Sequence, residues 1–295
     1  MSSFPFPPIA PGQNIHILAP ASKIILDTFA AGCDVLRARG FNPVIHPQCY
    51  AEDRQSAGTI AEKAVALQSI LDMPDPQIIW AAAGGNRTAH LLPLLRPGPV
   101  QHMMVGFSDI TALLHAPFLR GIFGPSVQRL ATLNAADSDY VFNLLTGQAT
   151  AYSLSDCIVL RPGKAQAPIL AGTLSLLTAL CGTPYMPDLR GCILAIEDVN
   201  EQASRIDRML WQLREAIPFQ SLAGLILGDF GDLPATGRPF GFTLEDIVRE
   251  HIAPYDFPVV MNAPFGHGPR LQSIPQGATA VLQATALNAQ MQFIA

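Results

Sequence analysis

The chain has 295 residues, of which 49% are hydrophobic and 14% charged, and its formal net charge at pH 7 is −5. This length favours two domains, and the apolar content excludes an intrinsically disordered chain. The acidic balance argues against nucleic acid or an anionic membrane as the main partner, because phosphate-rich surfaces select basic proteins.

The start of the chain and its cysteines favour a cytoplasmic location. Residues 1–8 contain no basic residue and several prolines, so we expect neither a signal peptide nor a membrane anchor. No apolar run approaches the roughly 18 residues of a membrane span. The five cysteines are scattered without a CxxC pair, which is typical of reduced thiols rather than of disulfides or zinc ligands. A catalytic cysteine is the alternative, although none stands at a glycine-flanked turn.

The first half alternates predicted strands with predicted helices. Strands are predicted within residues 14–22, 43–46, 77–82 and 101–106, and helices at residues 28–39, 59–71 and 137–145. This alternation is typical of a parallel sheet covered by helices. We therefore predict an α/β fold with an N-terminal domain over residues 1–148.

Two adjacent glycines, Gly84 and Gly85, follow the predicted strand at residues 77–82. Sites in parallel sheets form beyond the carboxyl ends of the strands, and glycines let the backbone approach a ligand with free N–H groups. A plain turn between strand and helix is the alternative. A dinucleotide or nucleotide phosphate site is disfavoured, because the GxGxxG and P-loop spacings are absent.

Ser108 and Asp109 stand where the strand at residues 101–106 gives way to a helix-like pattern. Ser108 should therefore lie at a sharp turn with its hydroxyl free, and the amide of Asp109 should point into the same space. A nucleophile and an oxyanion donor are two parts of an acyl-transfer site. Both residues are also favoured N-caps, so a structural role stays open. The nearby His102 and His115 are interpreted as structural.

A linker and a second α/β domain are predicted for the rest of the chain. Residues 149–170 are rich in Gly, Pro, Ala and Ser, with one predicted strand at 156–160, so we expect them to connect the domains. The C-terminal domain is predicted over residues 171–295. Its helices are expected at residues 172–182, 205–213 and 243–251, and its strands at residues 192–196, 222–227, 258–261, 278–282 and 290–294.

Two stretches of the second half carry candidate site residues. Glu197 and Asp198 follow a buried strand, where a carboxylate is well placed to hold an imidazole in one tautomer. Either could instead cap or charge-balance the next helix. His267 lies between glycines in a loop directly after a strand. Its ring should be unshielded and free to meet a partner, although a surface histidine without a role is the alternative.

Ser108, Glu197 and His267 together supply a nucleophile, an orienting acid and a base, each at or just after the end of a predicted strand. Ile110 replaces the second glycine of a Gly-x-Ser-x-Gly elbow, which argues against an ordinary α/β-hydrolase. Over nearly its whole length the chain resembles the LD-carboxypeptidase family, serine peptidases that trim muropeptides and include the microcin-immunity peptidases as a branch. The motifs that carry the resemblance lie at residues 17–22, 84–85, 91–95, 105–113, 174–177, 182–185, 196–201, 205–210 and 266–267.

The resemblance implies a fold and a set of site residues. The fold is a flavodoxin-like, parallel-sheet N-terminal domain plus a smaller α/β C-terminal domain, with a Ser-Glu-His triad between them. Ser108 would be the nucleophile, His267 the base and Glu197 its orienter. The backbone N–H groups of Gly85 and Asp109 would form the oxyanion hole. The family also implies a homodimer that uses no metal or cofactor.

Two departures from the family pattern concern substrate contacts. Muropeptide members typically have an arginine before the glycine pair and Tyr-Gly after it, whereas this chain has Ala83 before and Asn86-Arg87 after. A tyrosine usually precedes the Arg-Ile-Asp-Arg run, and Ser204 stands there. We expect Gly84, Asn86 and Arg87 to contact the substrate.

The expected reaction is hydrolysis of an L,D-peptide bond, which releases a terminal D-alanine from murein tetrapeptides in cell-wall recycling. The substrate is then a small peptide. One alternative is a microcin-immunity-like peptidase that cleaves peptidyl or aminoacyl adenylate mimics. Ala83 and Arg87, which depart from the muropeptide pattern, are the reason to consider it. The other is a non-catalytic binder of cell-wall peptides.

Overall fold

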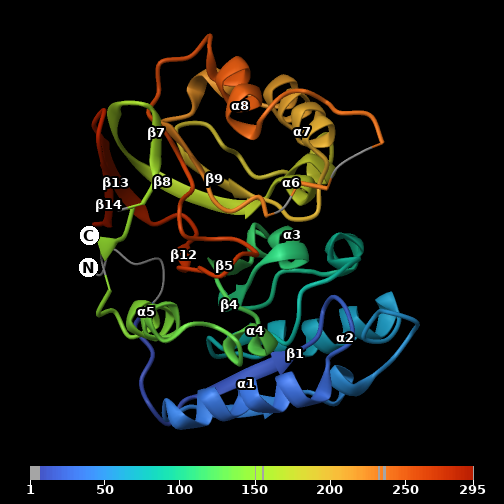
Figure 1. Ribbon diagram of the computed structural model, residues 1–295. Helices are drawn as coiled ribbons and strands as arrows, with labels where there is room; N and C mark the ends of the chain where they lie inside the picture. Colours follow the sequence, from blue (N-terminus) through green and yellow to red (C-terminus); the bar gives the residue numbers. More distant parts are fainter. Residues whose placement is uncertain (1–6, 150, 155, 232, 235–236, 295) are drawn as a thin grey trace.

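The computed structural model describes residues 7–149, 151–154, 156–231, 233–234 and 237–294. It contains two sheets, one in each half of the molecule, and the two halves pack on one another (Figure 1). Among these described residues, none of the helices combines the length and the hydropathy of a membrane span.

The first sheet has a parallel core in the order β2-β1-β3-β4-β5. Its strands are β1 (Asn14–Leu18), β2 (Asn42–Ile45), β3 (Ile78–Ala81), β4 (His102–Gly106) and β5 (Leu119–Phe123). This is the flavodoxin-like strand order, which confirms the predicted fold. The strand β5 was not predicted, because Arg120 and Gly121 interrupt its apolar run.

The helices of the first half begin and end at recognisable sequence signals. They are α1 (Leu26–Ala38), α2 (Ile60–Leu71), α3 (Thr111–Leu114), α4 (Val127–Leu130) and α5 (Ala135–Leu145), with 3-10 turns at η1 (Pro47–Tyr50), η2 (Thr88–Leu94) and η3 (Ser108–Ile110). A capping box of Thr59 and Glu62 starts α2. Gly40, with φ +84°, follows the end of α1 in the left-handed conformation that glycine tolerates.

The second sheet has eight strands in the order β6-β14-β13-β8-β9-β10-β11-β7. They are β6 (Ala151–Tyr152), β7 (Ile158–Arg161), β8 (Gly163–Thr173), β9 (Ile193–Glu197), β10 (Gly224–Leu227), β11 (Val259–Met261), β13 (Thr279–Ala284) and β14 (Ala289–Phe293). The neighbours β8, β9, β10 and β11 are parallel to one another. The helices of this half are α6 (Leu174–Leu180), α7 (Ala203–Ala216) and α8 (Leu244–Ile252), with a 3-10 turn η4 at Phe219–Ser221.

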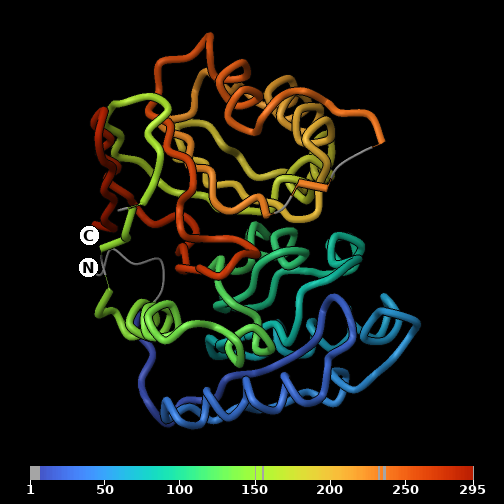
Figure 2. The backbone as a smooth tube through the Cα atoms, in the orientation of Figure 1, coloured from blue at the N-terminus to red at the C-terminus, as the bar shows by residue number. Residues whose placement is uncertain are grey.

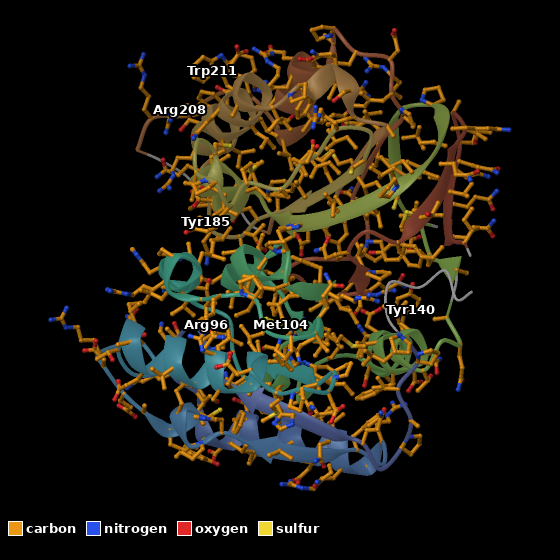
Figure 3. The ribbon with its side chains drawn as sticks, turned by 180° about the vertical axis from the view of Figure 1, so that it is seen from behind. Arg96, Met104, Tyr140, Tyr185, Arg208 and Trp211 are labelled. Atoms are coloured by element: carbon orange, nitrogen blue, oxygen red, sulfur yellow. The ribbon has the colours of Figure 1, made fainter. Side chains whose placement is uncertain are left out.

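The outer face of the second half is formed by α7 and α8 (Figure 1). Arg208 and Trp211 lie on the exposed side of α7 (Figure 3). Asp207, from the Arg-Ile-Asp-Arg run, accepts a hydrogen bond at 2.9 Å from His251 on α8. This motif residue therefore joins two helices, and it lies outside the candidate site.

The segment at residues 149–170 differs from the predicted linker. It contains β6, β7 and most of β8, all of which belong to the second sheet. The first residues of β8 alternate exposed or half-buried polar side chains with small ones, and only its last third is continuously buried. The polar and small residues of its first part hid a central strand, which pairs with β13 on one side and with β9 on the other.

One segment of the second half crosses to the first. After β11 the chain runs back along the junction between the halves (Figure 2) and adds β12 (Ile274–Pro275), antiparallel to β5, to the first sheet. Buried apolar residues of both halves, including Met104, Ile169 and Leu271, form one continuous core. Met104 lies within the first sheet, and Tyr185 lies at the junction (Figure 3). This crossing segment carries His267.

Candidate active site

Ser108 lies at the turn that follows β4, with φ +61°. A side-chain-bearing residue in this left-handed conformation costs free energy, and such residues concentrate at functional sites. Two glycines make room for the turn. A Cβ on Gly106 would lie 2.7 Å from Ile110 Cγ2, and a Cβ on Gly84 would lie 3.1 Å from Ser108 Cβ. The helix predicted after Ser108 is short, since η3 passes into α3, which ends at Leu114.

The structure brings Ser108, His267 and Glu197 into one hydrogen-bonded chain. The Ser108 Oγ lies 3.0 Å from His267 Nε2, and His267 Nδ1 lies 2.6 Å from Glu197 Oε2. An ionised carboxylate only accepts hydrogen bonds, so Glu197 selects the tautomer with its proton on Nδ1. Nε2 is then free to accept the proton of the Ser108 hydroxyl. The imidazole also packs on Phe107, with 4.9 Å between ring centroids.

Glu197 is fully buried at the end of β9, and its second oxygen is also used. Thr173, its neighbour in register on β8, donates its hydroxyl to Glu197 Oε1 at 2.5 Å. Gly266 passes above the carboxylate with φ +127°, and a Cβ there would lie 2.9 Å from Glu197 Oε2. The glycine before His267 is therefore needed for the ring to reach Glu197.

The pKa values of His267 and Glu197 are coupled. Burial lowers the pKa of His267, but the hydrogen bond and charge of Glu197, together with nearby carboxylate charges, leave the pKa raised above 6.5. The charges of Asp198 and Asp229 add to this rise. Burial raises the pKa of Glu197, against the lowering effect of its bonds from His267 and Thr173. The imidazole is therefore a stronger base than an isolated one.

Asp198 has a separate role from Glu197. Its two oxygens accept hydrogen bonds from the backbone N–H groups of Ser175, at 2.7 Å, and Val199, at 2.9 Å. Ser175 lies in the first turn of α6, where N–H groups have no partner within the helix. Of the two carboxylates singled out in the sequence, Asp198 is the one that caps a helix.

The backbone N–H groups of Gly85 and Asp109 are the expected oxyanion donors. Within the described residues, neither N–H has a hydrogen-bond acceptor. The Asp109 side chain is occupied, because it accepts hydrogen bonds from the Thr88 amide at 2.8 Å and the Thr88 hydroxyl at 2.7 Å. Gly85 has φ +132°, and a Cβ there would lie 1.9 Å from Ser22 Oγ. Both positions are thus held by neighbours while their N–H groups stay available.

The loop that carries His267 is tied to the first half by contacts that the sequence analysis missed. Arg129 donates to the Gly268 carbonyl at 2.6 Å, and Asp137, fully buried on α5, accepts from the Leu271 amide at 2.9 Å. Asp137 also pairs with Arg270 at 3.0 Å. These partners are more than 130 positions apart in the chain, so no local pattern could have revealed them.

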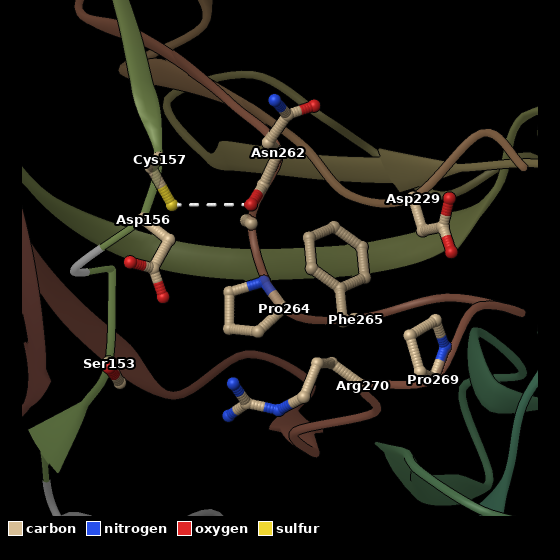
Figure 4. A pocket seen from close by; sticks show the side chains of 10 residues that line it. Ser153, Asp156, Cys157, Asp229, Asn262, Pro264, Phe265, Pro269 and Arg270 are labelled. Carbon is tan, nitrogen blue, oxygen red and sulfur yellow. Dashed lines mark hydrogen bonds between the residues drawn. The ribbon is translucent and has the colours of Figure 1, made fainter.

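The other face of this loop borders a cavity of about 270 Å³. Phe265, Pro269 and Arg270 line it together with Asp229 (Figure 4). Gly268 packs against Asp229 so closely that a Cβ on the glycine would lie 1.5 Å from Asp229 Oδ2. The His267 loop is therefore in contact with the first half through Arg129 and Asp137 and with the second half through Asp229.

The remaining predicted residues also have defined places. Gly84 contacts Ser108, while Asn86 and Arg87 are exposed and line a cavity of about 330 Å³. His102 and His115 are structural as expected. His102 accepts from the Gln77 amide, and His115 bonds the Ala171 carbonyl at 3.1 Å. No cluster of three His, Cys, Asp or Glu side chains suited to a metal ion occurs among the residues described.

Comparisons with known proteins identify the family and the fold. Residues 15–123 match the LD-carboxypeptidase N-terminal domain, and residues 166–282 match the LD-carboxypeptidase C-terminal domain. The murein tetrapeptide carboxypeptidase of Pseudomonas aeruginosa is 31% identical over 297 residues, covering 93% of this chain and 94% of that protein. The microcin self-immunity protein MccF of Escherichia coli is 24% identical, covering 92% and 90%.

The fold is shared with solved structures of similar size. The crystal structure of muramoyltetrapeptide carboxypeptidase from Oxalobacter formigenes superposes with a TM-score of 0.82 and 25% identity, covering 94% of this chain and 98% of that one. The two domain models match in order and together span more than half of the chain, and the Pseudomonas relative aligns over nearly its full length. The chain belongs to the LD-carboxypeptidase family.

Proposed function

We propose that this protein is a serine-type LD-carboxypeptidase that releases the terminal D-amino acid from a murein tetrapeptide. The observation that carries the proposal is the hydrogen-bonded chain from Ser108 through His267 to Glu197, built from both halves of the molecule. The names of the Pseudomonas and Oxalobacter relatives support a muropeptide as the substrate.

The proposed reaction is acyl transfer in two steps. His267 Nε2 takes the hydroxyl proton of Ser108 as Oγ attacks the carbonyl carbon of the scissile amide. The N–H groups of Gly85 and Asp109 stabilise the negative oxygen of the tetrahedral intermediate. Collapse breaks the C–N bond, and the leaving amine takes the proton from His267. Water then attacks the acyl-enzyme with His267 again as base, and Glu197 stabilises the imidazolium throughout.

Mass spectrometry of a panel of L,D-peptides tests this proposal. The wild type should release D-alanine from the tetrapeptide, and Ser108→Ala should lower kcat about 10⁴-fold or more, because the whole triad acts through that oxygen. Ser175→Ala, on α6 and bonded to Asp198 only through its backbone, is the matched control. A Ser108→Ala protein that released D-alanine at the control's rate would refute the assignment.

A second candidate is cleavage of aminoacyl or peptidyl adenylate mimics. Two observations support this second candidate. The chain is similar to the E. coli self-immunity protein, and it has Ala83 and Arg87 beside the glycine pair. Parallel assays on murein tetrapeptide and on such a mimic decide between the two by the ratio of kcat/KM. A serine-directed reagent that failed to label Ser108, together with measurable peptide binding, would instead favour a non-catalytic binder.

A further inference from the structure

The cavity lined by Asn86 and Arg87 lies directly beside the candidate site. It has a volume of about 330 Å³, and its wall also includes Ser22, Arg54 and Ser56. These residues come from three loops that follow β1, precede α2 and follow β3. In a flavodoxin-like sheet, β1 and β3 flank the point where the strand order reverses, which is where such folds bind ligands.

Close contacts connect this cavity to the nucleophile. The Ser22 amide donates to the Gly84 carbonyl at 3.2 Å, and Ser22 Oγ fills the space where a Gly85 Cβ would be. Gly84 in turn packs on Ser108. A peptide whose scissile carbonyl lay between Ser108 and the Gly85 N–H would therefore have its next residue within reach of the cavity.

The wall contains two guanidinium groups. Among the residues described, Arg54 and Arg87 form neither an ion pair nor a side-chain hydrogen bond, whereas surface arginines such as Arg37 and Arg249 pair with carboxylates. Asp53 is the only acidic residue of the wall. The cavity thus offers unused donors suited to a planar anion.

A buried lysine lies under the same wall. Lys63, on α2, is fully buried and donates from Nζ to Ser56 Oγ at 2.8 Å and to the Ala21 carbonyl at 3.3 Å. No carboxylate lies within ion-pair distance of it in the described part of the chain. Lys63 fixes Ser56 below the cavity, and burial lowers the pKa of its ammonium group.

We infer that this cavity binds the free α-carboxylate of the substrate's C-terminal residue, with Arg87 as its main partner and Arg54 as the second. The inference rests on the proposed function, because it needs the scissile bond to lie at Ser108. A carboxylate can occupy this position only when the peptide ends one residue after the cleaved bond. The two arginines would therefore make the enzyme a carboxypeptidase rather than an endopeptidase.

Hydrolysis of a matched peptide pair gives the first test. A tetrapeptide ending in D-alanine is compared with its C-terminal amide in the wild type, Arg87→Gln, Arg54→Gln and the double variant. Arg87→Gln should raise KM for the free acid about tenfold with kcat nearly constant, since it removes binding common to ground and transition states. The preference for acid over amide should fall towards one in the double variant. Arg37→Gln, which removes an arginine paired with Asp34 on α1, is the control.

Calorimetry on the Ser108→Ala protein separates this inference from the proposed function. Tighter binding of the free acid than of the amide, lost with Arg87→Gln, supports the carboxylate site even if the wild type proves not to cleave the peptide. An unchanged acid-to-amide ratio in the double variant would overturn the inference while leaving hydrolysis intact. Adenosine monophosphate is titrated as a second anion. If the arginine substitutions weakened its binding and spared the peptide, the cavity would be a phosphate site and the inference would be wrong.

Discussion

Ser108 has a backbone conformation that its side chain does not favour. A φ of +61° costs about 1–3 kcal/mol in a residue with a Cβ. The surroundings hold it there through the room left by Gly84 and Gly106 and through the hydrogen bond to His267. In this conformation the hydroxyl lies beyond the end of β4 and faces His267 of the other half of the molecule.

Glu197→Gln should change the pH profile as well as the rate. The pKa of His267 is above 6.5 in the wild type, so the neutral ring that accepts the serine proton is lost as the pH falls through that raised value. Without the carboxylate charge, burial becomes the main influence and the pKa should fall below 6.5. The acid limb of log kcat/KM should therefore move to lower pH. The plateau should fall about 10³- to 10⁴-fold, because the ring loses its fixed tautomer.

The control for this variant is Glu201→Gln. Glu201 lies close in sequence but pairs with Arg205 on α7. Its pH profile should match the wild type, and thermal unfolding should show both variants folded. An acid limb that stayed in place in Glu197→Gln would show that Glu197 does not set the pKa of the base.

The elements around the site act mainly by positioning. Neither β9 nor the loop after β11 contributes the nucleophile, yet they bring Glu197 and His267 to it. The contacts of Arg129 and Asp137 with residues 268–271 fix that loop on α4 and α5. We expect the geometry of the triad to depend on these helices as much as on the triad's own residues.

Asp137→Asn tests this dependence. The change keeps the side chain's size but removes the charge that pairs with Arg270, and it leaves the Leu271 amide with a weaker acceptor. Loss of a buried ion-pair partner is costly, but Arg270 is 45% exposed. We therefore expect the free energy of unfolding to fall by about 1–3 kcal/mol. Because the His267 loop loosens, kcat should fall about tenfold, measured on the same folded fraction.

Asp139→Asn, two residues along the same helix, is the matched control. Asp139 pairs with Arg39 at the surface, so its loss should cost less than about 0.5 kcal/mol and leave kcat unchanged. If Asp137→Asn lost stability and kept the wild-type kcat, the contacts would be structural only.

The two halves form one structural unit as well as one site. The strand β12 extends the first sheet from the second half, and buried residues of both halves share a continuous core. Ser108 follows a strand of one sheet, and Glu197 and His267 follow strands of the other. In the proposed mechanism, activity therefore requires the two halves to keep their relative position.

Urea unfolding gives the corresponding prediction. Far-UV circular dichroism, tryptophan fluorescence and D-alanine release should be lost with one common midpoint, because separating the halves would expose the shared core. Trp80 is buried in the first half and Trp211 lies on the surface of the second, so fluorescence of a Trp211→Phe protein follows the first half. Loss of activity at a lower urea concentration than the loss of structure would show that the halves separate first.

The sequence determined the α/β class and the turn at Ser108, which follow from local patterns of apolar periodicity, glycines and polar residues at strand ends. The flavodoxin-like form of the first half was implied by the family resemblance. The residues Ser108, Glu197 and His267 could be nominated from the same local patterns, and the family resemblance gave them roles that activity measurements still have to test.

Only the tertiary structure decided the course of β8, the pairing of β5 with β12, and the contacts that hold the His267 loop. Each depends on residues more than a hundred positions apart, and their composition gives no local signal. The tertiary structure also decided the cavity with Arg54 and Arg87, since its wall is assembled from three separate loops. Burial and long-range hydrogen bonds select these partners, and a local pattern along the chain does not record them.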